Sequence, residues 1–90
     1  MQVIAESPME WFLFEEDGRV WLDVLVQHEV VSFSVTAELR SGDPDAHVAM
    51  KAATMRELAL QREWTNPALP EGWFERSLEA VRAWRALHPY

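Results

Sequence analysis

The hydrophobic positions of the chain fall into two regions with different spacing. Between residues 9 and 40 they alternate with polar residues or form short aromatic and Val-rich runs, which is typical of β-strands. Between about residues 44 and 88 they recur every three or four positions, which is typical of amphipathic helices. Because the strands come first and the helices second, we predict one α+β domain over residues 1–90, with the order β-β-β-α-α.

The clearest local signal is a β-hairpin centred on Asp17-Gly18. An Asp-Gly pair between two strand-like runs favours a two-residue type I′ turn, in which both central residues need a positive φ. Such a turn fixes the register of the two strands, residues 9–16 and 19–27. The predicted pairs are Phe14 with Trp21, Phe12 with Asp23, Leu13 with Leu22, and Trp11 with Val24.

The next run alternates and predicts a third antiparallel strand over residues 30–40, half-buried. The residues expected to face the core are Val31, Phe33, Val35, Ala37 and Leu39. A tight turn at residues 28–29 would place Val26 opposite Val31. Residues 2–5 are a candidate for a short additional edge strand. The sheet is therefore expected to be a three-stranded antiparallel meander.

Two helices are expected after the strands. Asp43 as N-cap and Pro44 at the first helical position predict a helix that runs to about Trp64, and the second helix is expected over residues 71–88. We expect both helices to pack on one face of the meander, in a two-layer domain. The expected buried stripe of the first helix is Val48, Ala52, Met55, Leu58 and Ala59. That of the second is Phe74, Leu78, Val81 and Trp84, widened by Trp73, Ala80 and Leu87.

The two faces of the hairpin differ in character. The face assigned to the core carries Met9, Trp11, Leu13, Val20, Leu22, Val24 and Val26. The other face mixes aromatic and acidic residues, and it stays exposed if both helices cover the core face. A large exposed apolar patch usually has a partner. We therefore predict a partner-binding surface consisting of Glu10, Phe12, Phe14, Glu16, Trp21, Asp23 and Leu25. The alternative is that the chain itself covers this face, with a helix or with residues 1–8.

Charge narrows the class of partner. The net charge is −7, and residues 1–30 carry seven acidic residues against one basic residue. This balance argues against non-specific binding to nucleic acid and against an anionic membrane surface, since both require Lys and Arg. It suits a basic protein partner, and it also favours solubility. No signal-peptide pattern or membrane-spanning run stands out, so we expect a cytoplasmic protein.

Candidate chemistry is sparse. With no cysteine, the chain has no thiol nucleophile and no zinc-finger pattern. Asp43, Asp45 and His47 have a spacing that a metal could use, but a helix start explains them better, so we predict no metal site. His28 and Glu29 are adjacent at a predicted turn, and no motif places a nucleophile beside them. We therefore predict no catalytic residue and no cofactor.

The sequence thus favours a small acidic protein-interaction module. By analogy, the module would be of the inhibitor, immunity, antitoxin or adaptor type found in bacteria. Acidic residues of the hairpin would steer a basic partner, and the aromatic residues would anchor it. In a homodimer, Phe12 and Trp21 would instead be buried against a second copy of the chain. The alternative is a small-molecule-binding protein or small enzyme, as a monomer or homodimer, with a pocket between sheet and helices. Its first candidate residues are His28, His47 and Trp64.

Overall fold

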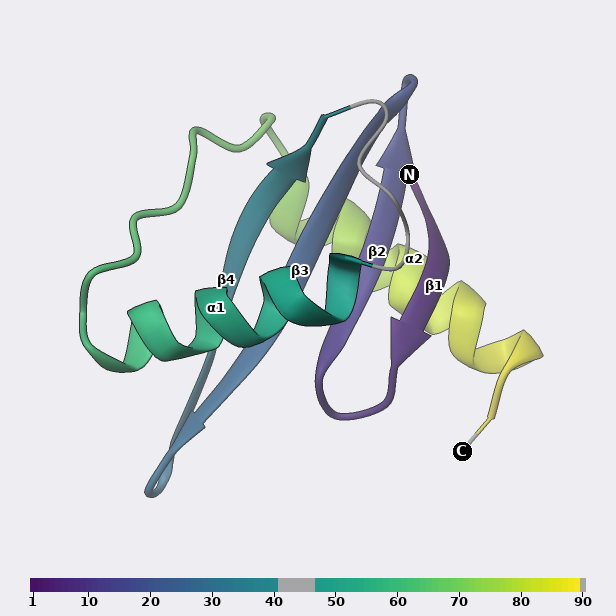
Figure 1. Cartoon of the computed structure of the whole chain (residues 1–90). Helices are drawn as coiled ribbons and strands as arrows, with labels where there is room; N and C mark the ends of the chain where they lie inside the picture. Colours follow the sequence, from purple (N-terminus) through teal and green to yellow (C-terminus); the bar gives the residue numbers. More distant parts are fainter. Residues whose placement is uncertain (41–46, 90) are drawn as a thin grey trace.

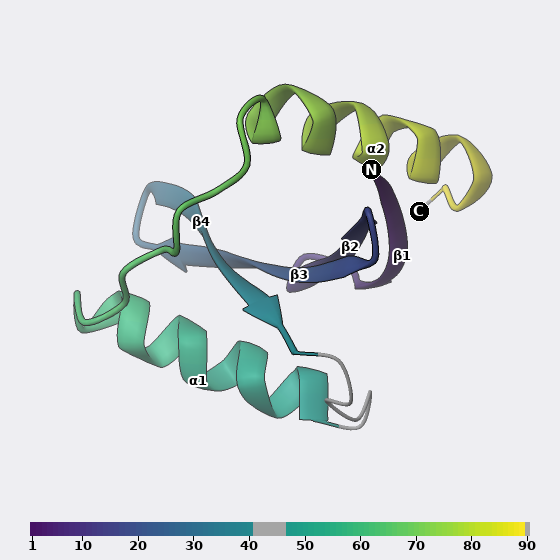
Figure 2. The same ribbon diagram turned by 90° about the horizontal axis from the view of Figure 1, so that it is seen from above.

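The computed structural model describes residues 1–40 and 47–89, and it shows an antiparallel sheet with one helix on each face (Figures 1 and 2). The strands lie in the order β1-β2-β3-β4, so the α+β class is confirmed. The sheet has four strands where a meander of three was expected, and the added one, β1, contains the candidate edge strand at residues 2–5. Neither helix in the described part of the chain is long and apolar enough to cross a membrane. The elements are β1 (Gln2–Ser7), β2 (Trp11–Glu16), β3 (Arg19–His28), β4 (Val31–Leu39), α1 (Val48–Leu60) and α2 (Trp73–Leu87).

The hairpin between β2 and β3 forms as its turn residues predict. Asp17 and Gly18 have φ values of 54° and 79°, the left-handed conformation that a type I′ turn requires at both positions. Phe14 lies opposite Trp21 and Phe12 lies opposite Asp23, so the predicted register is confirmed.

The register between β3 and β4 differs from the expectation by two residues. Val26 faces Phe33, not Val31, because the turn lies at residues 29–30. A shift of two residues keeps every side chain on its expected face. Val31 and Phe33 are nevertheless 56% and 39% exposed, and Met9 is 64% exposed, so these three are not part of the core.

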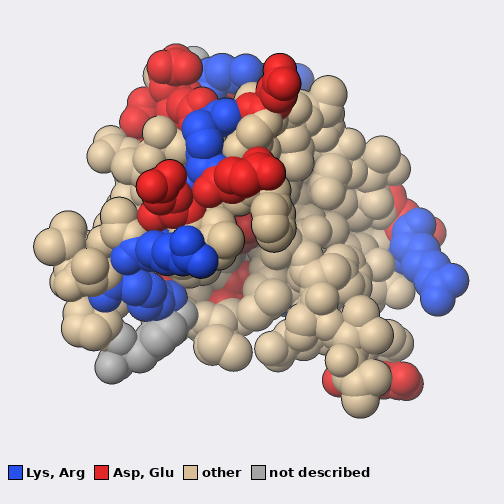
Figure 3. Space-filling view, turned by 180° about the vertical axis from the view of Figure 1, so that it is seen from behind, with Lys and Arg blue, Asp and Glu red and all other residues tan. Residues whose placement is uncertain are grey.

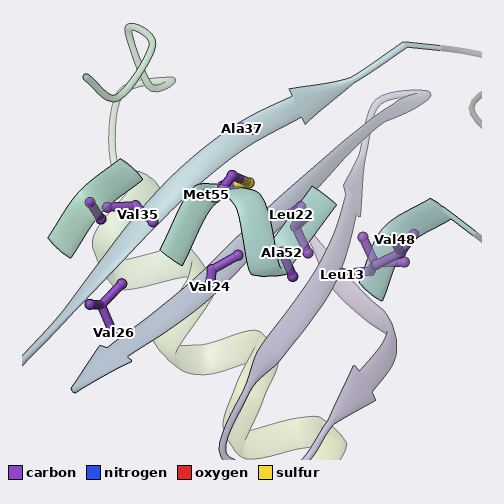
Figure 4. Packing of buried hydrophobic residues seen from close by; sticks show 10 residues of the cluster. Leu13, Leu22, Val24, Val26, Val35, Ala37, Val48, Ala52 and Met55 are labelled. Atoms are coloured by element: carbon purple, nitrogen blue, oxygen red, sulfur yellow. The ribbon is translucent and has the colours of Figure 1, made fainter. Parts of the chain in front are cut away.

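The first core lies between α1 and the sheet (Figure 4). The predicted stripe of α1 is buried at four positions, and Leu58 is half-buried. The helix ends at Leu60, four positions before the expected Trp64, and Arg62 beyond it has a left-handed φ of 62°. The predicted start at Asp43 and Pro44 lies outside the described residues. The buried members are Leu13, Leu22, Val24, Val26, Val35, Ala37, Val48, Ala52, Met55 and Ala59.

The expectation that both helices pack on one face is wrong. α2 covers the opposite face, where Val3, Phe14, Trp21, Trp73 and Ala80 form a second buried cluster. A sheet that is apolar on both faces needs cover on both, and α2 supplies it here. The fold therefore has three layers, α1, sheet and α2, as Figure 2 shows.

The segment between the helices makes this arrangement possible. Residues 61–72 pass around the edge of β4 and carry the chain from one face to the other (Figure 2). The amide N–H of Thr36 donates a hydrogen bond of 2.8 Å to Oδ1 of Asn66. The indole of Trp64 donates to the same oxygen, at 3.0 Å. One asparagine side chain thus fastens the crossing segment to the edge strand.

Candidate functional site

The aromatic face that we expected to be exposed is largely covered by α2. Phe14 and Trp21 are each 1% exposed. The indole of Trp73 packs on both, with ring centroids 5.7 Å from Phe14 and 5.1 Å from Trp21. The prediction that Phe14 and Trp21 form an exposed surface is therefore wrong, because Trp73, the first residue of α2, lies over them.

Two acidic residues of this face hold α2 in place. Glu16, a predicted binding residue, forms an ion pair of 3.0 Å with Arg76. The hydrogen bond from Arg76 holds the pKa of the Glu16 carboxyl below its ordinary value. Glu6 on β1 pairs with Arg85 at 2.6 Å and accepts a hydrogen bond from the indole of Trp84. These carboxylates are engaged within the chain, so Glu16 does not belong to an open surface.

Further along the same face, the helix and the sheet diverge and leave a cleft of about 240 Å³. Five of the seven predicted residues come together there: Glu10, Phe12, Phe14, Asp23 and Leu25. Ser34 of β4 and the α2 residues Phe74, Ser77, Leu78 and Val81 complete the wall with Met9 and Trp11. Figure 3 views this side of the molecule and shows acidic atoms recessed in a hollow near its centre.

Asp23 is the main polar group of the cleft. It lies in the middle of β3, directly opposite Phe12 on β2 and Thr36 on β4. Burial raises the pKa of its carboxyl to about 6, and a long hydrogen bond of 3.5 Å from Thr36 Oγ1 offsets this only in part. Among the described residues that line the cleft, none is basic. The lining that the structure describes therefore offers this carboxylate no cation.

The mouth of the cleft is apolar on one side and acidic on the other. Phe74 and Leu78 of α2 are 74% and 44% exposed, and Met9 lies across from them. The expectation that Phe74 and Leu78 are buried is wrong, whereas Trp73 and Ala80 of the same predicted stripe are buried against the sheet. Glu10, which is exposed, accepts a hydrogen bond of 2.8 Å from Ser7.

The contribution of α2 to the cleft was missed by sequence reasoning. Phe74 and Leu78 are four residues apart and share a helix face, with Ser77 beside them. That spacing predicts a buried stripe, and it is equally compatible with side chains at the exposed edge of a cleft. Nothing in the spacing alone separates the two interpretations.

The other candidate residues do not gather into one site. His28 lies exposed at the end of β3, beside Val31, Phe33 and Leu60. Trp64 is half-buried and packs against the α1-side core. Within residues 1–40 and 47–89, no three His, Asp or Glu side chains are grouped as a metal would require. Of the proposed metal spacing, Asp43 and Asp45 lie outside the described residues.

Comparison with known protein families, with curated proteins and with solved structures gave no match.

Proposed function

We propose that this protein is a small acidic interaction module that binds a basic protein partner at the cleft between α2 and the sheet. The observation that carries the proposal is the carboxyl of Asp23 at the floor of an apolar cleft, with no basic residue among the described lining residues. A buried acid without a counter-charge weakens a fold, and such groups are concentrated at functional sites. A cationic group from outside would supply what the cleft lacks.

The dimensions of the cleft favour a side chain over a larger ligand. Its volume of about 240 Å³ is below the roughly 300–1,000 Å³ that is usual for small-molecule and cofactor sites. The alternative function, a small-molecule-binding protein, was predicted at His28, His47 and Trp64, and none of these three residues lines this cleft. The exposed apolar lip formed by Phe74, Leu78 and Met9 favours a protein partner, because it offers contact area beyond the cleft itself.

Charge supports the choice of a basic partner. Seven of the fifteen acidic residues lie in residues 1–30, and Glu10 stands at the mouth of the cleft. An acidic surface raises the association rate of a basic partner at low ionic strength. Steering by charge and anchoring in the cleft are separate steps, so salt should affect the first more than the second.

The proposal can be tested with a Lys- and Arg-rich peptide and a control peptide that has Glu at the same positions. Each is titrated into ¹⁵N-labelled protein at low and at moderate salt. The expected result is that only the basic peptide binds, and that amide shifts concentrate at residues of the cleft such as Phe12, Asp23 and Ser77.

Two matched variants separate the cleft from general attraction between charges. Ser77→Trp places an indole in the cleft, whereas Ala83→Trp adds the same group at an exposed position of α2 that does not line it. We expect Ser77→Trp to abolish binding and Ala83→Trp to leave it intact. Equal binding by both variants, or shifts spread evenly over the acidic surface, would show that the cleft is not the site.

A further inference from the structure

We infer that the group received by this cleft is a primary ammonium on an unbranched alkyl stem, supplied by a lysine side chain of the partner. The inference rests on the proposed function, and it names the chemistry of the anchoring residue. It follows from the oxygen atoms and the apolar walls that share the cleft.

The polar atoms of the cleft match the donors of an ammonium group. Asp23, Ser34 and Ser77 all line it, each with a side-chain oxygen. Ser77 Oγ donates its hydrogen to the carbonyl of Phe74 at 3.0 Å, so its lone pairs remain to accept. Asp23 has a single hydrogen bond among the described residues, the long one from Thr36. An ammonium carries three donors, one for each of these side chains.

The walls suit the stem of a lysine. Phe12, Phe14, Leu25 and Val81 present rings and methyl groups along the cleft. Lysine buries its methylene chain along such a surface while its charged end finds a polar partner. Arg85, whose guanidinium lies 5.5 Å from the Phe12 ring centre, pairs with Glu6 and is not among the residues that line the cleft.

Arginine and neutral groups match the polar side chains of the cleft less well than an ammonium group does. A guanidinium is a wide planar group with five donors in a rigid fork, whereas an ammonium is a compact charge whose three donors can turn toward Asp23, Ser34 and Ser77. A neutral apolar chain would fill the walls, but it would leave the Asp23 carboxylate without a counter-charge. The combination therefore selects an ammonium.

The experiment uses one basic peptide that carries a single test position between fixed flanking residues. The test position holds lysine, arginine, Nε-acetyl-lysine or norleucine, and binding is followed through indole fluorescence and amide shifts at the cleft. We expect the lysine peptide to bind at least about tenfold more tightly than the other three. Butylamine, which supplies the same group free in solution, is titrated in parallel and is expected to bind far more weakly.

The matched variants are Asp23→Asn and Asp17→Asn. Both remove one negative charge, but Asp17 lies exposed in the β2–β3 turn, where asparagine is well accommodated. We expect Asp23→Asn to weaken the lysine peptide by at least about tenfold and Asp17→Asn to leave its affinity unchanged.

The outcomes distinguish a failure of the lysine inference from a failure of the proposed function. Equal or tighter binding of arginine or norleucine would overturn the lysine inference and leave the proposed function standing. Tighter binding of butylamine than of the lysine peptide would overturn the assignment to a protein side chain. If none of the four peptides shifts the cleft residues, the proposed function fails and the inference fails with it.

Discussion

The indole of Trp73 packs on that of Trp21 with ring centroids 5.1 Å apart and planes inclined by 59°. This contact joins the first residue of α2 to the middle of the sheet. It belongs to the buried cluster that packs α2 on this face of the sheet. The aromatic pair therefore helps to hold α2 where its residues form one wall of the candidate site.

Removing that contact should release α2 from the sheet. Trp73→Ala is expected to lower the free energy of unfolding by about 3–5 kcal/mol, because a large buried ring is lost and a cavity replaces it. Phe74→Ala is the matched control, since its neighbouring ring is 74% exposed and its loss should change stability by about 0.5 kcal/mol or less. Urea denaturation followed by circular dichroism measures both, and equal effects would argue against the packing described.

Local turn chemistry explains which parts of the sheet were predictable. Asp17 and Gly18 both favour the positive φ values of a two-residue turn, so the β2–β3 register could be predicted from the sequence alone. The β3–β4 turn has no such residues, and Glu29 adopts a left-handed φ of 56° there without a glycine or asparagine to signal it. Tertiary pairing, not local preference, fixes that register.

Burial of an acid without a counter-charge makes stability depend on pH in an unusual direction. Burial raises the pKa of Asp23 to about 6 in the folded state, above its ordinary value of 3.8. The folded chain then holds its proton more tightly than the unfolded chain, so stability falls as the pH rises from about 4 to about 6. At higher pH this single group costs up to about 3 kcal/mol.

The variant Asp23→Asn isolates this effect. It should match the wild type near pH 4 and exceed it above pH 7 by up to about 3 kcal/mol, because asparagine does not ionise. Chemical denaturation at a series of pH values gives the difference between the two proteins. A constant difference across the series would mean that the carboxyl of Asp23 is solvated in the folded protein.

The segment that crosses from one face to the other depends on Asn66. Asn66→Ala removes the acceptor of both the Thr36 amide and the Trp64 indole, and it should cost about 1–3 kcal/mol. Asn66→Asp keeps an oxygen at the same place, so it should retain most of that stability. If the two substitutions cost the same, the hydrogen bonds to Asn66 contribute little and packing alone holds the crossing.

The side chosen by each helix was not accessible from periodicity. Both faces of the sheet are apolar, so the pattern permits both helices on one face or one on each. The choice depends on the path of residues 61–72 around β4, which is a tertiary property. The site was likewise predictable only in part. The hairpin register places Phe12, Asp23 and Leu25 on one face of the sheet, but the periodicity of the sequence does not show that α2 packs over that face.

Replacing Glu29, which has a left-handed backbone conformation, by glycine should stabilise the fold. Glu29→Gly should stabilise the protein by about 0.5–1 kcal/mol, because glycine adopts a φ of 56° without the steric cost that a side chain brings. Glu63→Gly, at an exposed position with no positive φ, is the control and should give no such gain. Thermal unfolding of both variants is sufficient, and a loss of stability in Glu29→Gly would contradict the turn geometry.

The most direct test of the account is the ¹³C titration of the Asp23 carboxyl by NMR, with and without the lysine peptide. The described cleft residues of β2, β4 and α2 include no basic residue, Thr36 Oγ1 donates a hydrogen bond to this carboxyl, and Glu10 is the other titratable residue of the described cleft lining. We expect a midpoint near pH 6 in the free protein. Bound lysine should lower it, because a cation beside a carboxylate favours the charged form. A midpoint near 4 in the free protein, or one that stays near 6 when the peptide is bound, would contradict the assignment of this cleft as a lysine-binding site.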